Sequence, residues 1–273
     1  MPAMDKGDSS KMPGQKTDSF PVVRIENPAA PGPFLIVCEH ASNTFPAEFG
    51  DLGLTEEERK AHIAWDPGAL GLARGIATRL EAPLVAAEVS RLVYDINRAP
   101  NAPGAMTVRS ETYDIPGNQG LRPQDRLRRT TSIYQPFHAA LHGEIARRLA
   151  VGESPILVTV HSFTPVYFGK KRDVEFGVIH DADPTLAKAV EKAALAQTTL
   201  KTRLNAPYSA ADDVTHTLRL QATPYGLANV MLEIRNDLLS DAAAEEAMAD
   251  KIAPALKAAI ASIESFPSKM AAV

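Results

Sequence analysis

The chain has 273 residues, of which 45% are hydrophobic and 23% are charged. These proportions are typical of an ordinary globular protein, and they exclude a disordered, collagen-like or coiled-coil chain. The 29 Lys and Arg residues against 33 Asp and Glu residues leave a formal net charge of −4, which offers no electrostatic footprint for nucleic acid or an anionic membrane.

The N-terminal segment comes first along the chain. Residues 1–20 are polar and aperiodic, and they lack the apolar core of a secretory signal, so we expect a flexible tail followed by a single domain over 21–273. No apolar run approaches the roughly 20 residues that span a bilayer. The single cysteine, Cys38, excludes an internal disulfide and favours a reducing, cytoplasmic location.

Short apolar runs alternate with longer helical stretches in the rest of the chain. The runs predict strands buried on both faces, over Phe34–Cys38, 84–88, 92–96, 156–160, 174–180 and Asn229–Arg235. The helices are expected over 57–64, 68–80, 127–150, Thr185–Gln197 and 242–266. Alternating strands and helices predict a three-layer α/β/α sandwich with a mostly parallel, mixed central sheet.

Several helix signals are specific. Thr55 and Glu58 form a predicted capping box before the first helix. Pro136 and Pro254 are expected to interrupt or kink the helices that contain them. The segment 99–123 is long, aperiodic and rich in Pro, Gly and Asn. Loops of this length in compact domains are usually functional or disordered, so we expect it to lie over an active site.

Two histidines follow apolar strands in the predicted sheet. His40 comes shortly after Phe34–Cys38, and His161 directly follows 156–160. Ligands of α/β sheets bind beyond the carboxyl ends of the strands, and catalytic zinc takes histidine nitrogens and a carboxylate while one position stays open. The two histidines and an acid are therefore a candidate site for zinc, although manganese, iron or cobalt fits similar ligands.

Three further side chains suit the chemistry of such a site. Glu233 lies within an apolar strand, where an unpaired carboxylate is rare and its pKa is expected to rise, as suits a general base. Asn97 and Arg98 have two interpretations of equal weight. They are turn residues, or they form a fork for a substrate carboxylate, since Arg binds carboxylates bidentately. Arg91 is a second candidate for that carboxylate, or a partner of Asp95.

Other patterns carry less information. His138 and His142 have the i, i+4 spacing of a helical metal chelate, but no Glu follows His138. The better interpretation is a surface pair, or one histidine that supports the ligands of a nearby site. The chain has no G-x-S-x-G elbow, no phosphate-binding P-loop and no G-x-G-x-x-G fingerprint, which argues against serine hydrolases, nucleotidases and dinucleotide enzymes.

Five stretches together resemble those of the N-formylglutamate amidohydrolase family, in its predicted bacterial branch. These stretches are CEHASN, HIAWDPGA, SRLVYDINRAP, VTVHSF and VMLEIRNDL, in order from about residue 33 to about 240. The family is similar in turn to zinc carboxypeptidases and aspartoacylases. The resemblance implies a phosphorylase/hydrolase-like sandwich, as in zinc exopeptidases, and metal-assisted hydrolysis of an N-acyl amino acid.

The resemblance also implies roles for single residues. His40 and His161 match metal histidines, Asn97–Arg98 resembles a carboxylate-binding pair, and Glu233 resembles a general base. Carboxypeptidases use H-x-x-E for two ligands, but Asn43 stands at the position of that glutamate.

Asn is a poor zinc ligand, so the carboxylate must come from elsewhere in the chain. Asp66, in AWDPGA, is the first candidate for the third ligand, and Glu39 is the alternative.

These observations predict a metal-dependent amidohydrolase that cleaves an N-formyl or N-acyl amino acid, with N-formylglutamate as the first candidate substrate. One alternative is a protein of the same fold that binds acidic metabolites without catalysis. Another is a metal amidohydrolase for a different N-acyl amino acid or a small peptide.

Overall fold

The computed structural model describes residues 20–264. The predicted tail, apart from Phe20, and residues 265–273 of the predicted domain lie outside the described residues. A seven-stranded mixed sheet, mostly parallel, forms the centre, in the order β1-β3-β2-β6-β11-β9-β10. Its strands are β1 (Val23–Glu26), β2 (Phe34–Cys38), β3 (Leu84–Ala87), β6 (Ile156–Phe163), β9 (Phe176–Ile179), β10 (Thr202–Leu204) and β11 (Asn229–Arg235).

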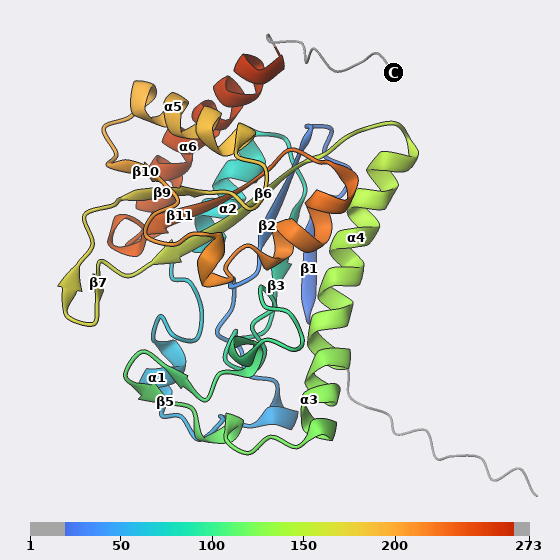
Figure 1. Cartoon of the computed structure of the whole chain (residues 1–273), viewed down its shortest axis with the longest axis vertical. Helices are drawn as coiled ribbons and strands as arrows, with labels where there is room; N and C mark the ends of the chain where they lie inside the picture. The colour runs from blue at the N-terminus through green and yellow to red at the C-terminus, as the bar shows by residue number, and fades with distance from the viewer. Residues whose placement is uncertain (1–19, 265–273) are drawn as a thin grey trace, which may run out of the picture.

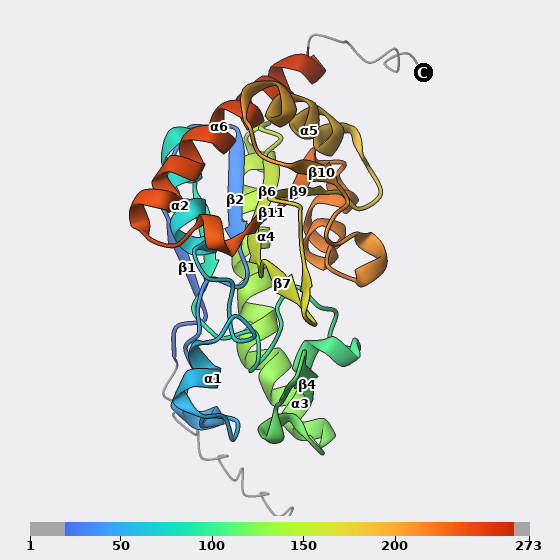
Figure 2. The ribbon, with the colours of Figure 1, turned by 90° about the vertical axis from the view of Figure 1, so that its left-hand side faces the viewer.

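Helices cover both faces of this sheet (Figures 1 and 2). The side chains of β2 alternate: Phe34 and Ile36 join one apolar cluster, whereas Leu35 and Val37 join the other. The first cluster is closed by α2 (Ala69–Arg79), α5 (Thr185–Gln197) and α6 (Ala242–Glu264). The second is closed by α4 (Gln135–Ala150) and the π-helical turn Leu218–Ala222. The predicted α/β/α sandwich is therefore confirmed.

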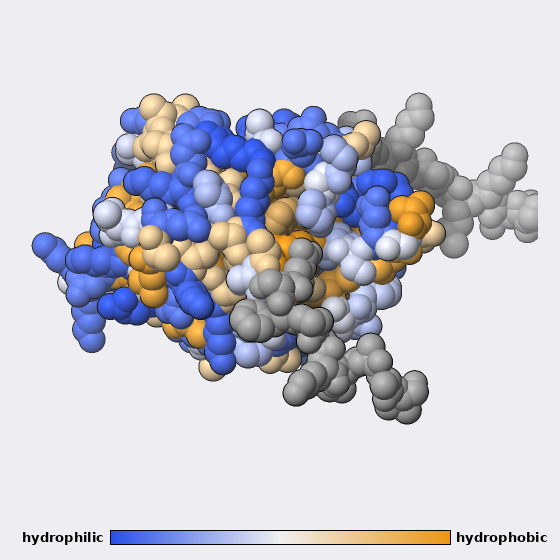
Figure 3. Space-filling view, turned by 90° about the horizontal axis from the view of Figure 1, so that it is seen from above, coloured by the Kyte–Doolittle hydropathy of each residue, from blue (hydrophilic) through white to orange (hydrophobic). Residues whose placement is uncertain are grey.

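Several shorter helices and hairpins lie at one end of the sheet. The helices α1 (Glu56–Lys60) and α3 (Pro123–Arg129) lie there, together with the hairpin of β4 (Arg109–Ser110) and β5 (Tyr113–Asp114). A second hairpin joins β7 (Val166–Tyr167) to β8 (Lys170–Lys171) directly after β6. In the view from above, hydrophilic residues are interspersed with smaller hydrophobic areas (Figure 3). Within the described part of the chain, no helix has the length and apolar character needed to cross a membrane.

One predicted strand is wrong. Residues 92–96 form turns, because Ser90 Oγ accepts a hydrogen bond from Leu92 N and Asp95 Oδ1 accepts one from Asn97 N. Such side-chain bonds offer the backbone an alternative to a sheet ladder. The apolar residues of this segment are buried in the second cluster, so their hydrophobicity reflects packing beneath the sheet. The short strands β1 and β10 were not predicted.

Several element boundaries also differ from expectation. The strand predicted over 156–160 continues to Phe163, so His161 lies within β6 and not after it. The capping box at Thr55 is present, but α1 ends at Lys60 and buries none of its residues. A π-helical turn, Thr130–Tyr134, joins α3 to α4 just before Pro136. α6 continues through Pro254 as one helix.

Candidate active site

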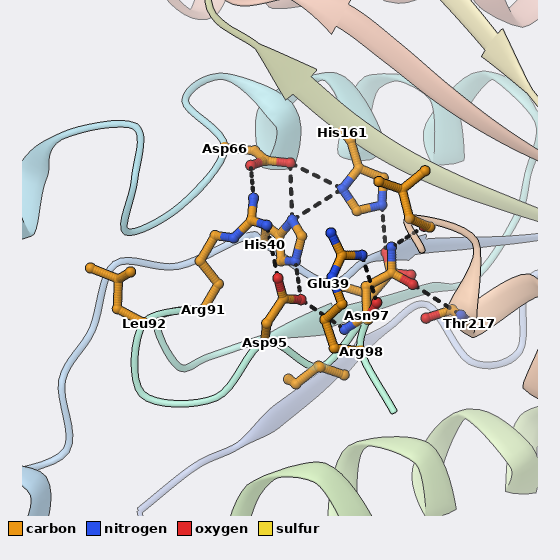
Figure 4. A network of polar contacts seen from close by, with 12 residues as sticks. Glu39, His40, Asp66, Arg91, Leu92, Asp95, Asn97, Arg98, His161 and Thr217 are labelled. Atoms are coloured by element: carbon orange, nitrogen blue, oxygen red, sulfur yellow. Dashed lines mark hydrogen bonds and ion pairs between the residues drawn. The ribbon is translucent and has the colours of Figure 1, made fainter. Parts of the chain in front are cut away.

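Two buried histidines and a buried aspartate meet at the carboxyl ends of the central strands (Figure 4). The Nδ1 atoms of His40 and His161 lie 3.2 Å apart. Asp66 Oδ2 lies 3.2 Å from Nδ1 of His40 and 3.0 Å from Nδ1 of His161. Each of the three side chains therefore directs one atom that could bind a metal ion, called a donor atom below, toward a common point.

The backbone around Asp66 fixes this arrangement. Asp66 N donates to the carbonyl of His40 at 2.9 Å, which fastens the loop before α2 to the residues after β2. Ser162 Oγ donates to the carbonyl of Pro67 at 2.7 Å, which fastens the same loop to β6. These two hydrogen bonds to backbone carbonyls hold the three segments together independently of the contacts among the side chains of His40, Asp66 and His161.

The second ring nitrogen of each histidine, Nε2, lies close to a carboxylate. His40 Nε2 lies 2.8 Å from Asp95 Oδ1, and His161 Nε2 lies 3.2 Å from Glu39 Oε2. Metal-binding histidines almost always have such a partner, which fixes the ring orientation and raises the basicity of the ligand. Glu39, the alternative ligand from sequence, lies on the far side of the His161 ring from Asp66. The geometry therefore favours Asp66 as the third donor.

Arg91 links the two aspartates of this network. Its Nη1 lies 3.3 Å from Asp66 Oδ1, and its Nη2 donates to Asp95 Oδ2 at 2.8 Å. The arginine thus holds the donor carboxylate Asp66 and the partner of His40 together (Figure 4). Its side chain is 27% exposed and also lines the cavity described below.

The charges of the site favour a cation at the donor atoms. Burial by itself would raise the pKa of Asp66, but the attraction and hydrogen bonds of the neighbouring His40 and His161, with the charge of Arg91, hold it well below its usual range. Burial would lower the pKa of His161, but the carboxylates of Glu39 and Asp66 raise it well above its usual range. Carboxylates that hold a proton on an imidazole in this way also attract a divalent ion.

The donor set fits a zinc-like ion. Tetrahedral zinc with Zn–N and Zn–O distances near 2.0–2.1 Å places its ligand atoms about 3.4 Å apart. The separations of 3.0–3.2 Å between the donor atoms of His40, Asp66 and His161 are close to that value.

Glu233 faces the same site from the neighbouring strand. It is the register partner of His161 in the parallel pair β11–β6. The residue is 4% exposed, and its Oε2 has no hydrogen-bond partner among the described residues. Burial, and then the charge of Asp66, raise the pKa of Glu233 to about 7. Such a carboxyl group can both accept and release a proton near neutral pH.

A cavity of about 210 Å³ connects these groups. Apart from the alternative ligand Glu39, the site residues predicted from the sequence all line it, namely His40, Asp66, Arg91, Asn97, Arg98, His161 and Glu233. From the segment 99–123, Ser110 and Glu111 also line the cavity, so part of that segment lies beside the candidate site.

Asn97 and Arg98 make backbone contacts in addition to lining the cavity. Asn97 Nδ2 donates to the carbonyl of Val214, and its Oδ1 accepts from Thr217 N at 2.9 Å. Arg98 Nη1 donates to the carbonyl of Asp213. The pair therefore fixes the segment 213–217 against the site, and its contact with a substrate carboxylate stays a prediction.

Several residues of the site could not be assigned from the sequence. The sequence predicts Asp95 only as a partner of Arg91, although metal-binding histidines usually pair with a carboxylate through their second nitrogen. His62 and Glu111 pair at 3.0 Å on the cavity wall, and Tyr208 lines it too. No local pattern marks these three. His138 is buried and lies 3.0 Å from the carbonyl of Ile96, away from the donor atoms.

Comparison with known proteins places the chain in a family. The model of the N-formylglutamate amidohydrolase family matches residues 32–240. The chain belongs to the N-formylglutamate amidohydrolase family. No protein with a curated description is significantly similar to it in sequence.

Two solved structures are similar to this member of the family. The gene product Atu2144 from Agrobacterium tumefaciens is 48% identical, with a TM-score of 0.88, over 90% of this chain and 98% of that chain. The N-formylglutamate amidohydrolase from Ralstonia eutropha JMP134 is 17% identical, with a TM-score of 0.65, over 90% of this chain and 100% of that chain. The second likeness shows that the fold of this amidohydrolase family is retained at low sequence identity.

Proposed function

We propose that the chain is a metal-dependent amidohydrolase that cleaves an N-formyl or N-acyl amino acid, with N-formylglutamate, giving formate and glutamate, as the first candidate. The observation that carries this proposal is the buried carboxylate of Glu233, whose Oε2 has no hydrogen-bond partner in the described part of the chain. It lies in the same cavity as the buried candidate donors His40, Asp66 and His161. Membership of an amidohydrolase family supports it.

The donor residues would hold the metal ion. His40 and His161 supply nitrogen and Asp66 supplies oxygen, a set that zinc prefers and that manganese, iron or cobalt also accepts. A divalent ion bound there supplies Lewis-acid polarisation of the amide carbonyl and activation of a water molecule. Asp95, through a hydrogen bond to His40, and Glu39, through an ion pair with His161, favour the ring orientations in which both Nδ1 atoms face Asp66.

Glu233 is the proposed general base. Its carboxylate takes a proton from the attacking water and passes it to the leaving amine. The absence of a hydrogen-bond partner for Oε2 among the described residues leaves that oxygen available for the proton. Because the register of β11 and β6 sets Glu233 beside His161, the base is next to the donors without any rearrangement of the sheet.

Substrate binding is assigned to the cationic side of the cavity. Arg98 binds the α-carboxylate of the substrate, since a guanidinium recognises a carboxylate with two parallel bonds. Asn97 fixes Arg98 and the segment 213–217 in place, and it lies close enough to the cavity to contact the same carboxylate. Arg91 is the second cation available to an anionic substrate. The proposed partner is thus a small acidic molecule. We place the reaction in the cytoplasm, where a buried free thiol such as Cys38 stays reduced.

The variant Glu233→Gln tests the proposal. It keeps the size of the side chain and removes the base, so we expect kcat on N-formylglutamate to fall at least about 100-fold while the bound metal, measured by mass spectrometry, stays unchanged. Glu246→Gln, at an exposed glutamate that pairs with Arg79, is the matched control and should keep full activity.

Two results would contradict the proposal in different ways. Near-native turnover by Glu233→Gln would remove Glu233 as the base. A native protein that carries no metal, binds acidic amino acids and hydrolyses none of a panel of N-acyl amino acids would instead be a binding protein on this fold. Hydrolysis of other members of the panel, with N-formylglutamate untouched, would identify a different amidohydrolase.

A further inference from the structure

A second hollow of about 520 Å³ adjoins the catalytic cavity. Arg98, Tyr167, Tyr208 and Val214 line both spaces, so the two are continuous. The cations around the second hollow are Arg98, Lys170 and Arg172, and the acid is Asp212. Its lining thus carries a net positive charge. The lining of the adjoining cavity is mixed, with the carboxylates Asp66, Glu111 and Glu233 beside two arginines and three histidines.

Arg172 is the cation of this hollow whose position is set by surrounding aromatic rings. It follows the β7–β8 hairpin, and its guanidinium lies 4.3 Å from the ring of Tyr167, 4.9 Å from that of Tyr208 and 5.5 Å from that of Phe163. Three rings at these distances attract the guanidinium and limit its movement. The position of the arginine head group is therefore set largely by aromatic contacts.

The hydrogen bonds of Arg172 leave its charge without an acidic partner. Its Nη1 donates to the carbonyl of Thr164 at 3.5 Å, which is a long contact, and no carboxylate among the described residues forms an ion pair with it. Arg235, whose side chain donates to the backbone carbonyl of Arg172, is by contrast bound to Asp237 at 2.7 Å. An arginine that is oriented but lacks an anion is suited to accept one from a ligand.

We infer that the second hollow binds a further anionic group of the substrate, and that Arg172 is the residue that makes the enzyme prefer N-acyl amino acids with an acidic side chain. This inference rests on the proposed function and names its substrate class. With the amide at His40, Asp66 and His161 and the α-carboxylate at Arg98, the side chain extends past Tyr208 toward Arg172. Lys170 adds charge at the outer rim, where it is exposed.

The test compares two substrates of nearly equal size, N-formylglutamate and N-formylglutamine, which differ by one negative charge. We expect the native enzyme to favour N-formylglutamate in kcat/KM by about tenfold or more, as one charge-assisted, bidentate contact provides. In Arg172→Met, which keeps an unbranched side chain without the charge, this preference should vanish while the rate on N-formylglutamine stays the same. Arg172→Lys should restore part of the preference, because it keeps the charge and loses the fork. Arg203→Met, at an exposed arginine outside both spaces, is the control.

Several outcomes would overturn the inference while the proposed function stands. One is a native enzyme that hydrolyses both substrates equally well. Another is an Arg172→Met variant in which both rates fall by the same factor, since a merely structural arginine would act in that way.

Calorimetry separates the inference from the proposed function if no N-formyl substrate is hydrolysed. Glutamate and glutamine are then the probes. Tighter binding of glutamate that is lost in Arg172→Met supports the anionic subsite, whereas equal binding of the two, or no binding of either, overturns it.

Discussion

Glu39 and His40 are neighbours in sequence but serve different rings of the site. His40 presents Nδ1 to the donor group and Nε2 to Asp95, whereas Glu39 contacts Nε2 of His161. This division is possible because both residues lie in the turn directly after β2, where side chains no longer alternate between two faces. This short turn therefore supplies one candidate metal ligand, His40, and also the carboxylate that positions another, His161.

Asp95 should act on the metal through His40. We expect Asp95→Asn to weaken zinc binding by about 10–100-fold, because loss of the carboxylate lowers the basicity of the ligand and frees its ring. Competition with a chromophoric chelator measures this affinity. The matched control is Asp250→Asn, since Asp250 pairs with Arg79 on the surface. Equal affinities of native protein and Asp95→Asn would show that His40 is not a ligand or needs no partner.

The donor residues could be predicted from the sequence, but their partners could not. His40 and His161 follow apolar runs, and the carboxyl ends of parallel strands meet at one edge of a sheet. The contact of Asp95 with His40 depends instead on the turn over 92–96, which the apolar composition of that segment disguised as a strand. Tyr208 and Glu111 come from loops whose path is set by tertiary packing, so no period or spacing identifies them.

At the scale of elements, three adjacent strands position Glu233, the proposed base. β11 lies between β6 and β9, with Glu233 opposite His161 on one side and Gly177 on the other. A Cβ at Gly177 would overlap the carbonyl oxygen of Ala206 and would lie 3.2 Å from the Cβ of Glu233. The missing side chain at this position therefore lets the segment before Tyr208 pack closely against the strand beside the base.

Gly177→Ala should consequently destabilise the protein and disturb the site. The overlap involves backbone, which moves only with strain, so we expect a loss of about 1–3 kcal/mol in the free energy of unfolding and a lower kcat. Urea unfolding followed by circular dichroism measures the first quantity.

Gly143→Ala is the matched control for that substitution. Gly143 lies within α4, where an added Cβ meets nothing within 4 Å. Alanine there should stabilise the protein by about 0.5–1 kcal/mol with kcat unchanged. If Gly177→Ala had the free energy of unfolding of the native protein, the loop before Tyr208 would be able to move away from the added methyl group without loss of stability.

The fold itself was predictable at this scale because its strongest patterns are long. β2 and β11 are buried almost throughout, and they were predicted with the bounds they have. β1 and β10 could not be predicted from the sequence because both are short and each contains exposed or half-exposed residues. Helix α1 was predicted too long, since it buries no side chain and a capping box alone cannot extend a helix.

At the scale of the whole molecule, the sheet brings charge together at one end. The candidate donor His40 follows β2, and His161 and Glu233 each lie two residues before the end of their strands, β6 and β11. The carboxylates Glu39, Asp66 and Asp95 are all buried there. Arg91 compensates part of this negative charge through its pairs with Asp66 and Asp95. The remaining buried charge is costly in a low-dielectric region unless a further cation compensates it. The stability of the native chain should therefore depend on the ion as well as on the two apolar clusters.

Removal of the metal should thus lower the melting temperature. An ion that binds only the folded state, at a free concentration of 1,000 times its Kd, stabilises by about 4 kcal/mol, which corresponds to roughly 10 °C for a chain of this size. We expect dialysis against a chelator to lower Tm by that order and added zinc to restore it, as measured by scanning calorimetry. Asp66→Ala should lose the zinc-dependent rise. His142→Ala should keep it in full, since His142 is exposed on α4 and is not among the donors. A zinc-dependent rise that disappears with His142 and survives without Asp66 would move the metal site from the sheet to the helix.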